Sequence, residues 1–395
     1  SSSSQFQDYL DHGARSPYAG MFLTEDDVYP GGMRDVDRDA LFVIGADLPF
    51  VECALGDGRR QRLWATFTER QIDLNPAHPQ TEAYLDAVLA KLAQSGARRV
   101  RLDAVGFTVK TAGTSCFLTP QTFTYIDHLC RRAHALGLEV LAETHTHFER
   151  QCEVAEHVDW VYDFALGPLL LHSLFEGTGE SLKRWFAMSP RNAITVLDTH
   201  DGIDVGDVAA DRLAPHRPGL LDDDAIDALV AKIHHNSGGV SARASGAAAG
   251  NVDVHQINCT YYEALRRDDE AYLAARLVQL FAPGIAQIYY VGLLAGTNDE
   301  AGFARSGVGR DVNRRYYSRQ EVEADLSRPV VQRLMSMIRL RNDHPAFRGT
   351  FEVRDSPDHT LVLRRAFGDY WAQAHVDFRT ASFEVRCSHP ETFAP

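Results

Sequence analysis

The sequence predicts an α/β fold, a (β/α)8 TIM barrel that lacks its first strands, with loop-rich insertions and a small antiparallel β domain at the C-terminus. Three observations predict it. Apolar strand-like runs alternate with amphipathic helical runs in mid-chain, which indicates βα units and a parallel sheet. Three of these runs end at an acidic residue, as strands do at the C-terminal face of a barrel. Residues 349–386 instead alternate like antiparallel strands.

The barrel elements are expected in order along the chain. Apolar residues recur at helical spacing over 81–94. The other expected elements are strand Val100–Val105, helix 120–136, strand Leu138–Glu143, strand Trp160–Leu166, helix 168–175, strand Ala193–Asp198, helix Asp269–Phe281, strand Ala286–Val291 and helix Pro329–Asn342. A closed barrel has eight strands and these are fewer, so the first strands would lie before Ser1. We therefore expect this chain alone to have an open sheet edge and to be inactive.

A change of pattern along the chain predicts its division into domains. The expected segments are a loop-rich insertion (B-like) domain at 1–75, barrel strands and helices at 76–202, a second insertion at 203–266, the end of the barrel at 267–345 and the C-terminal β domain at 346–395. Within the second insertion, 237–251 is rich in Gly, Ala and Ser. A loop of that length inside a compact domain is usually functional.

Composition narrows the class of protein. The 40 basic and 54 acidic residues give a net charge of −14, which argues against nucleic acid or an anionic membrane as partner. No apolar run approaches the length of about 18 residues that a membrane span needs. The six cysteines include no CxxC pair, so we expect reduced thiols and a cytoplasmic protein.

Three acids follow strand-like runs and are the candidate catalytic groups. Asp103 comes two residues after Arg101, so both would share one face of a strand, and the arginine would lower the pKa of the carboxyl. Glu143 follows an apolar run, which would raise its pKa toward that of a proton donor. Asp201 follows His200 in a Thr-His-Asp-Gly turn.

Each acid alone also fits an ordinary structural role, namely an Arg–Asp pair, a strand-end glutamate and an Asx turn. Together, three acids at the ends of three strands favour catalysis. They can serve as nucleophile, proton donor and charge stabiliser, which are the groups that break a glycosidic bond with retention.

No metal site is expected. His145 and His147 form an HxH pair, but no third ligand lies at a recognisable spacing. The glycines near the candidate acids do not make a phosphate-binding fingerprint either, so phosphate would be held by side chains such as Arg310.

At these residues the chain resembles a known family. The segments Arg101–Gly106, Glu143–His145 and Leu197–Gly202 resemble the motifs of the α-amylase superfamily, glycoside hydrolase family 13. Longer runs resemble its sucrose phosphorylase branch. These are Ala112–Phe117, Val161–Leu166, Thr195–Ile203, Thr260–Tyr262 and Gly309–Arg314.

The resemblance implies a role for each candidate residue. Asp103 would be the nucleophile, Glu143 the general acid/base and Asp201 the transition-state stabiliser. Arg101, His200, Phe67 and Gln71 would line the glucosyl subsite, and the other implied substrate-binding residues are His145, Asp253, His255, Gln256 and Arg310. The implied reaction transfers a glucosyl group from sucrose or a close analogue to inorganic phosphate, giving α-D-glucose 1-phosphate and fructose. The reaction needs no cofactor, and inorganic phosphate is a co-substrate. The expected partners are small sugars and phosphate. A homodimer is the candidate assembly.

Two departures from the family pattern leave the acceptor open. Gly45 stands where sucrose phosphorylases carry a phosphate-holding arginine. His255 replaces a tyrosine and resembles the sucrose 6′-phosphate phosphorylases, and glucosylglycerol phosphorylase is a further alternative. An amylase-like hydrolase or transglucosidase, or an inactive fragment, are the alternatives outside phosphorolysis.

Overall fold

The computed structural model describes residues 3–43, 48–246 and 256–389. Backbone contacts divide the chain into two units. Unit 1 comprises Ser1–Thr144 and Glu156–Trp160, and unit 2 comprises His145–Ala155 and Val161–Pro395.

The N-terminal part of unit 1 is more regular than predicted. It holds α1 (Ser4–His12), α2 (Glu25–Val28), α3 (Asp35–Ala40) and an antiparallel hairpin of β1 (Phe50–Ala54) and β2 (Arg60–Trp64). The side chains of Ser3 and Thr24 cap α1 and α2 by accepting backbone N–H bonds. Capping side chains define where α1 and α2 begin, and these helices are too short to show a clear apolar period. The apolar pattern therefore did not predict them.

The rest of unit 1 forms a parallel βαβ arrangement, as predicted. Its elements are α4 (Pro79–Gln94), β3 (Arg99–Leu102), α5 (Pro120–Ala135) and β4 (Glu139–Ala142). β3 pairs with β4 in parallel, with Arg101 opposite Leu141 and Leu102 opposite Ala142. Both helices begin with a proline after a capping side chain, His78 for α4 and Thr119 for α5. The carboxyl ends of β3 and β4 therefore lie side by side.

Unit 2 carries three further parallel strands. β5 (Trp160–Asp163) pairs with β6 (Ala193–Thr195) from Val161 onward, and β6 pairs with β9 (Ile285–Ala286). β5 ends three residues earlier than predicted because the Asp163 carboxylate accepts the Leu166 N–H at 3.0 Å where α7 begins. β9 is also short, and α13 (Tyr290–Leu293) occupies the end of the expected strand.

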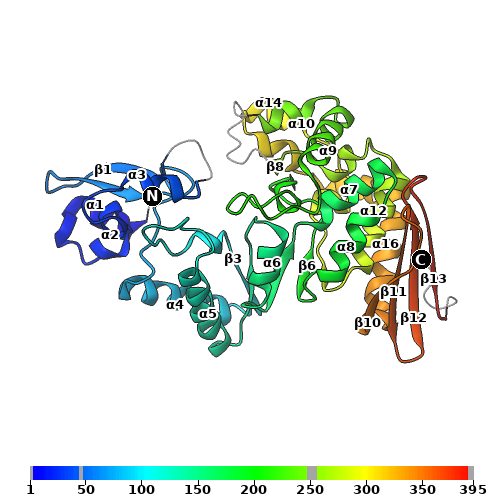
Figure 1. Cartoon of the computed structure of the whole chain (residues 1–395), viewed down its shortest axis with the longest axis horizontal. Coiled ribbons are helices and arrows are strands. Elements are labelled where there is room, and N and C mark those ends of the chain that lie inside the picture. The colour runs from blue at the N-terminus through cyan, green and yellow to red at the C-terminus, as the bar shows by residue number, and fades with distance from the viewer. Residues whose placement is uncertain (1–2, 44–47, 247–255, 390–395) are drawn as a thin grey trace. The chain divides into compact units, whose positions relative to one another are not determined.

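Helices enclose the core of unit 2. They include α7 (Leu166–Glu176), α8 (Glu180–Met188), α12 (Asp269–Phe281) and α16 (Pro329–Asp343). Every residue of α12 from Ala271 onward is buried, and the helix has the bounds predicted for it. α12 contacts α16 and the C-terminal strands (Figure 1).

The second insertion, 203–266, contains more helix than predicted. Its strand β7 (Ile203–Asp204) pairs with β8 (Gln256–Ile257), and its α-helices are α9 (Asp223–Asn236), α10 (Val240–Ser245) and α11 (Tyr261–Ala264). Outside the insertion, unit 2 also holds α6 (Phe148–Ala155), α14 (Glu300–Ser306) and α15 (Arg319–Leu326). The expected loop at 237–251 is wrong for α10, whose side chains at Val240 and Ala244 are buried against Val312. The apolar residues of this stretch recur only poorly at helical spacing, so the sequence pattern did not predict α10. The helix packs against Val312, which is distant in sequence.

The predicted antiparallel C-terminal sheet is confirmed. β10 (Thr350–Arg354), β11 (Thr360–Phe367), β12 (Tyr370–Asp377) and β13 (Ser382–Cys387) pair in that order. Buried Leu361 and Leu363 alternate along β11 and place one face of the sheet in the core. Among the described residues, no helix is long and apolar enough to cross a membrane.

A buried ion pair anchors the segment that follows β6. Arg276 Nη2 donates to Asp198 Oδ1 at 2.7 Å, and both side chains are at most 2% exposed. Arg276 also donates to the Tyr272 hydroxyl at 2.9 Å and to Gln279 Oε1 at 2.9 Å. A buried charge needs such partners because it has lost its water.

Arg276→Met should therefore lower the free energy of unfolding by about 3–5 kcal/mol, since Asp198 would be left buried without its counter-charge. Urea unfolding measures this loss. The double variant Arg276→Met/Asp198→Val should be more stable than the single variant. An equal or larger loss in the double variant would show that packing, rather than the unpaired charge, sets the cost.

Candidate active site

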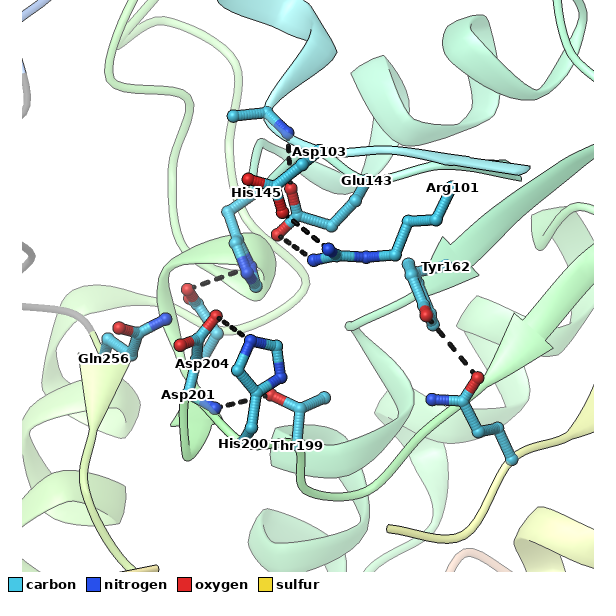
Figure 2. Close-up of polar contacts among 12 residues, drawn as sticks. Arg101, Asp103, Glu143, His145, Tyr162, Thr199, His200, Asp201, Asp204 and Gln256 are labelled. Carbon is cyan, nitrogen blue, oxygen red and sulfur yellow. Dashed lines mark hydrogen bonds and ion pairs between the residues drawn. The ribbon is translucent and has the colours of Figure 1, made fainter. Parts of the chain in front are cut away.

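The candidate acids at the ends of β3 and β4 share one arginine in unit 1 (Figure 2). Arg101 Nη1 lies 2.6 Å from Asp103 Oδ1, and its Nη2 lies 3.5 Å from Glu143 Oε1. The side chain of Asp103 is 72% exposed and that of Glu143 is 9% exposed. The predicted Arg–Asp pair is present, and it extends to Glu143. One carboxylate is thus open to a ligand, and the other is enclosed.

The backbone after β3 turns sharply around this group. Ala104 has a φ of 47°, in the left-handed region, which costs about 1–2 kcal/mol for a residue with a Cβ. Its N–H donates to Glu143 Oε2 at 2.7 Å. Two residues later, a Cβ on Gly106 would lie 2.6 Å from the Phe117 ring, so only glycine fits. The strained turn holds the buried carboxylate in place.

Two of the three unit 1 residues predicted for the glucosyl subsite, Phe67 and Gln71, lie on one loop. The Phe67 ring is half-exposed and meets the Phe107 ring edge-to-face, with centroids 5.6 Å apart. Gln71 Oε1 accepts the Thr68 hydroxyl at 2.9 Å. Phe107 is part of a 3-10 turn, η3 (Val105–Phe107), that follows Asp103. The Phe67 ring therefore contacts the turn that follows Asp103, the candidate nucleophile.

In unit 2, Asp201 is held by three cationic or potentially cationic side chains. Arg310 Nη1 and Arg314 Nη2 lie 2.9 Å and 3.0 Å from Asp201 Oδ1. His200 Nε2 lies 3.4 Å from Oδ2. Arg310 also donates to Gln256 Oε1 at 2.9 Å. Four of the predicted site residues thus meet within this unit, and Arg314 joins them.

The turn that carries Asp201 requires glycine. Thr199 N–H donates to Gly202 O at 3.0 Å, and Gly202 N–H donates back to Thr199 O at 3.1 Å. Gly202 has a φ of 103°, and a Cβ there would lie 2.2 Å from Ile257 O. The Thr199 hydroxyl accepts the Asp201 N–H at 3.1 Å (Figure 2). Sequence analysis allowed a simple Asx turn here as a purely structural explanation. The observed turn also has the paired Thr199–Gly202 backbone bonds and requires glycine at position 202.

His145 lies between two buried carboxylates of unit 2. Its Nδ1 is 3.1 Å from Asp204 Oδ2 and 3.3 Å from Asp207 Oδ2. Asp207 Oδ1 accepts the Thr146 N–H at 2.6 Å, and the ring of Phe164 stacks on His145 with centroids 4.0 Å apart. A hydrogen bond between Nδ1 and Asp207 Oδ2, together with the ion-pair contact to Asp204 Oδ2, holds this cluster together. His147 is absent from it, because its Nε2 bonds Pro218 O at 3.1 Å.

Two buried acids of unit 2 have strongly raised pKa values. Burial raises the pKa of Asp207 to about 7, and the nearby Asp204 charge adds to this while His145 opposes it. Burial also raises the pKa of Asp163 to about 6, against the opposing hydrogen bond from the Trp185 indole at 3.1 Å. Perturbed acids of this kind often lie at functional sites, although structural networks perturb them as well.

Sequence reasoning missed several polar residues of the site and proposed some that lie outside the described residues. The missed residues are Arg314, Asp204 and Asp207, and Asn313, whose Nδ2 donates to His200 O at 3.1 Å. Arg314 lies in the same run as Arg310, and the two acids follow the Thr-His-Asp-Gly turn, so nearness to a recognised motif was the available signal. Gly45, Asp253 and His255 lie outside the described residues.

One small cavity in unit 2 is lined in part by two of the predicted site residues. His145, Gln256, Asp204 and Thr199 line one small cavity of about 10 Å³ together with Phe164, Pro168, Val196, Leu197, Asp198 and Gly202. A cavity of that size holds about one water. The predicted residues His145 and Gln256 are therefore neighbours in unit 2.

Asp207→Asn should change how stability depends on pH. Because the folded pKa of about 7 exceeds the ordinary value of about 4, the contribution of Asp207 is present below pH 4 and is lost as pH rises to about 7. Urea unfolding of wild type should thus show a loss, on the order of a few kcal/mol between pH 5 and 8, that the variant lacks.

Asp211→Asn is the matched control. Burial opposes ionisation of Asp211, but hydrogen bonds from the Leu213 N–H and Arg150 outweigh it and lower the pKa. Its contribution therefore changes only below about pH 4, and Asp211→Asn should leave the difference between pH 5 and 8 as in wild type. An unchanged pH dependence in Asp207→Asn would contradict the raised pKa.

Comparison with known proteins places these residues in a family, although no family model matches the chain. A sucrose phosphorylase of Agrobacterium vitis is 46% identical over 386 residues, covering 98% of this chain and 79% of the relative. A glucosylglycerol phosphorylase of Marinobacter adhaerens is 40% identical, covering 99% and 79%.

Among solved structures, a sucrose 6F-phosphate phosphorylase from Thermoanaerobacter thermosaccharolyticum superposes with a TM-score of 0.89 at 35% identity. The match covers 98% of this chain and 78% of that one. The predicted barrel fold with a C-terminal β domain is thereby confirmed. The chain belongs to the sucrose phosphorylase branch of glycoside hydrolase family 13, within the α-amylase superfamily.

Proposed function

We propose that the protein is a glycoside phosphorylase that cleaves sucrose or a close analogue with inorganic phosphate, giving α-D-glucose 1-phosphate and fructose. The observation that carries the proposal is the Arg101 bridge between an exposed carboxylate, Asp103, and an enclosed one, Glu143. A retaining glycosyl transfer needs two carboxyl groups in these two environments. The identities of the relatives support phosphate as the acceptor.

In the first half-reaction, a carboxylate oxygen of Asp103 attacks the anomeric carbon as the bond from that carbon to the leaving oxygen breaks. Glu143 gives its proton to the leaving oxygen, so fructose departs neutral and a β-glucosyl ester remains. Arg101 holds the Asp103 side chain in one orientation for the attack. Asp201, fixed by Arg310 and Arg314, stabilises the positive charge on the sugar ring.

In the second half-reaction, a phosphate oxygen attacks the same carbon and the ester bond to Asp103 breaks. The Glu143 carboxylate accepts the phosphate proton, which restores both side chains. Two displacements at one carbon retain its configuration. Arginine guanidinium groups suit phosphate because of their paired N–H donors, and Arg310 is the proposed phosphate contact.

The proposal includes no metal and no organic cofactor, with phosphate as co-substrate. We propose a cytoplasmic location because all six cysteines are free thiols. The partners proposed are small sugars and phosphate, without nucleic acid or membrane, and the proposed assembly is a homodimer.

Sucrose 6′-phosphate and glucosylglycerol are the alternative donors, and each matches the name of a relative. The feature that would select among them, His255, lies outside the described residues. Hydrolysis or transglucosylation uses the same three acids, so the acceptor alone separates it from phosphorolysis.

Release of α-D-glucose 1-phosphate should depend on phosphate and on one preferred donor. The purified full-length protein would be given phosphate with sucrose, sucrose 6′-phosphate or glucosylglycerol in separate reactions, and the sugar phosphate would be quantified enzymatically. Free glucose at a rate independent of phosphate would contradict phosphorolysis and favour a hydrolase.

Glu143→Gln should reduce turnover of these donors by about 10²–10⁴-fold, because the leaving oxygen loses its proton donor. Glu139→Gln is the matched control, since Glu139 lies at the opposite end of β4 and pairs with Arg99 at 2.7 Å. Comparable losses in the two variants would show that strand stability, rather than proton donation, sets the rate.

A further inference from the structure

Lys110 is a buried lysine close to the glucosyl side of the candidate site. Its side chain is 1% exposed and lies in unit 1, seven residues after Asp103. A lysine this enclosed is rare, because its ammonium must find protein partners in place of water. Neither the sequence patterns nor the proposed mechanism uses it.

The ammonium group of Lys110 has three polar partners. Nζ lies 3.0 Å from Asp73 Oδ2 and donates to Thr66 Oγ1 at 2.9 Å. It also donates to the backbone carbonyl of Phe107. The three donor positions of the ammonium are thus matched by three acceptors. The rings of Trp64 and Phe107 lie 5.3 Å and 5.6 Å from Nζ, within reach of cation–π attraction.

Two of these partners close the loop 66–73 at its ends. Thr66 N–H donates to Asp73 Oδ1 at 3.0 Å, and the Thr66 hydroxyl donates to Asp73 Oδ2 at 2.6 Å. The loop between them carries Phe67 and Gln71, which the family resemblance assigns to the glucosyl subsite. We call the Phe67 ring the glucosyl wall. Lys110 therefore binds both ends of the segment that presents this wall.

The third partner connects Lys110 to the turn that follows the nucleophile candidate. Phe107 ends η3, and its ring receives the edge-to-face contact of Phe67. One ammonium group thus joins the loop 66–73 to η3, through contacts at Thr66, Asp73 and Phe107. These contacts are short and directional, and they fix where Phe67 lies relative to the backbone after Asp103.

We propose that Lys110 is a positioning residue of the glucosyl subsite, which holds the Phe67 loop in register with the nucleophile turn. The inference rests on the proposed function, because the family resemblance behind that function assigns Phe67 to the glucosyl subsite. Lys110 touches no reacting atom in this account. A displacement of the wall by about 1 Å can cost a factor of about 100 in rate, so the effect should be measurable.

The test is a double-mutant cycle between Lys110→Met and Phe67→Ala, with kcat/KM measured for the preferred donor at saturating phosphate. Lys110→Met alone should lower kcat/KM by about 10- to 100-fold. In the Phe67→Ala background the same change should cost less than about threefold, because the wall that Lys110 positions is gone. Equal losses in the two backgrounds, or no loss in the first, would overturn the proposal.

Hydrogen exchange gives a readout that does not depend on activity. The amides of 66–73 should exchange faster in Lys110→Met than in wild type. Lys183→Met is the matched control, since Lys183 Nζ also donates to backbone carbonyls, those of Ser356 and Pro357, in unit 2. Unchanged exchange of 66–73 in Lys110→Met would overturn the positioning role.

If Lys110→Met does not fold, the double variant Lys110→Met/Asp73→Asn takes its place, because it removes both charges of the ion pair. Its kcat/KM and the hydrogen exchange of 66–73 are then measured in the same way. Wild-type turnover separates this inference from the proposed function. Absence of glucose 1-phosphate release by the full-length wild-type protein contradicts the proposed function. An active wild type with a neutral Lys110→Met contradicts only the role of Lys110.

Discussion

The parallel register of β3 and β4 is the constraint on which the unit 1 group of Arg101, Asp103 and Glu143 depends. Because Arg101 lies opposite Leu141 and Leu102 opposite Ala142, the next residues along the two strands are Asp103 and Glu143. Side chains alternate along a strand, so a slip of one residue would send one carboxylate to the other face. In the observed register Arg101 reaches both acids, and the Ala104 N–H reaches the enclosed one. The pairing of β3 with β4 thus determines which groups contact the carboxylates of Asp103 and Glu143.

Three acids of unit 2 each contact a different kind of partner. Asp198 is fully enclosed and has a fully enclosed arginine. Asp201 is less enclosed and contacts two arginines, which leaves cationic groups beside the turn that carries it. Asp207 has a second carboxylate and a histidine instead, and its pKa rises to about 7. Asp198, with its buried arginine, therefore anchors the backbone after β6, whereas the Asp201 side chain stays 13% exposed.

The sequence predicted the parts of the site that local pattern determines. Acids at strand ends, the Arg101–Asp103 pair and the bounds of α12 follow from alternation and helical period, and all are observed. The predicted end of β5 is too late because Asp163 accepts the Leu166 N–H where α7 begins. β3 and β6 also end three residues earlier than predicted, at Leu102 and Thr195. The partners of His145 could not be predicted, because Asp207 lies far along the chain and is brought near by folding. The same holds for Lys110 and Asp73, whose pairing depends on the loop between distant elements.

The central claim is that Asp103 carries the glucosyl group between donor and phosphate. It is tested most directly by giving the Glu143→Gln protein α-D-glucosyl fluoride, whose leaving group needs no proton donor. The protein is then digested at low pH and its peptides are measured by mass spectrometry. The account predicts that the peptide containing Asp103 gains the mass of one anhydroglucose unit, with the sugar on that carboxyl group. Fluoride release with a sugar on another residue, or with no modified peptide at all, would contradict it.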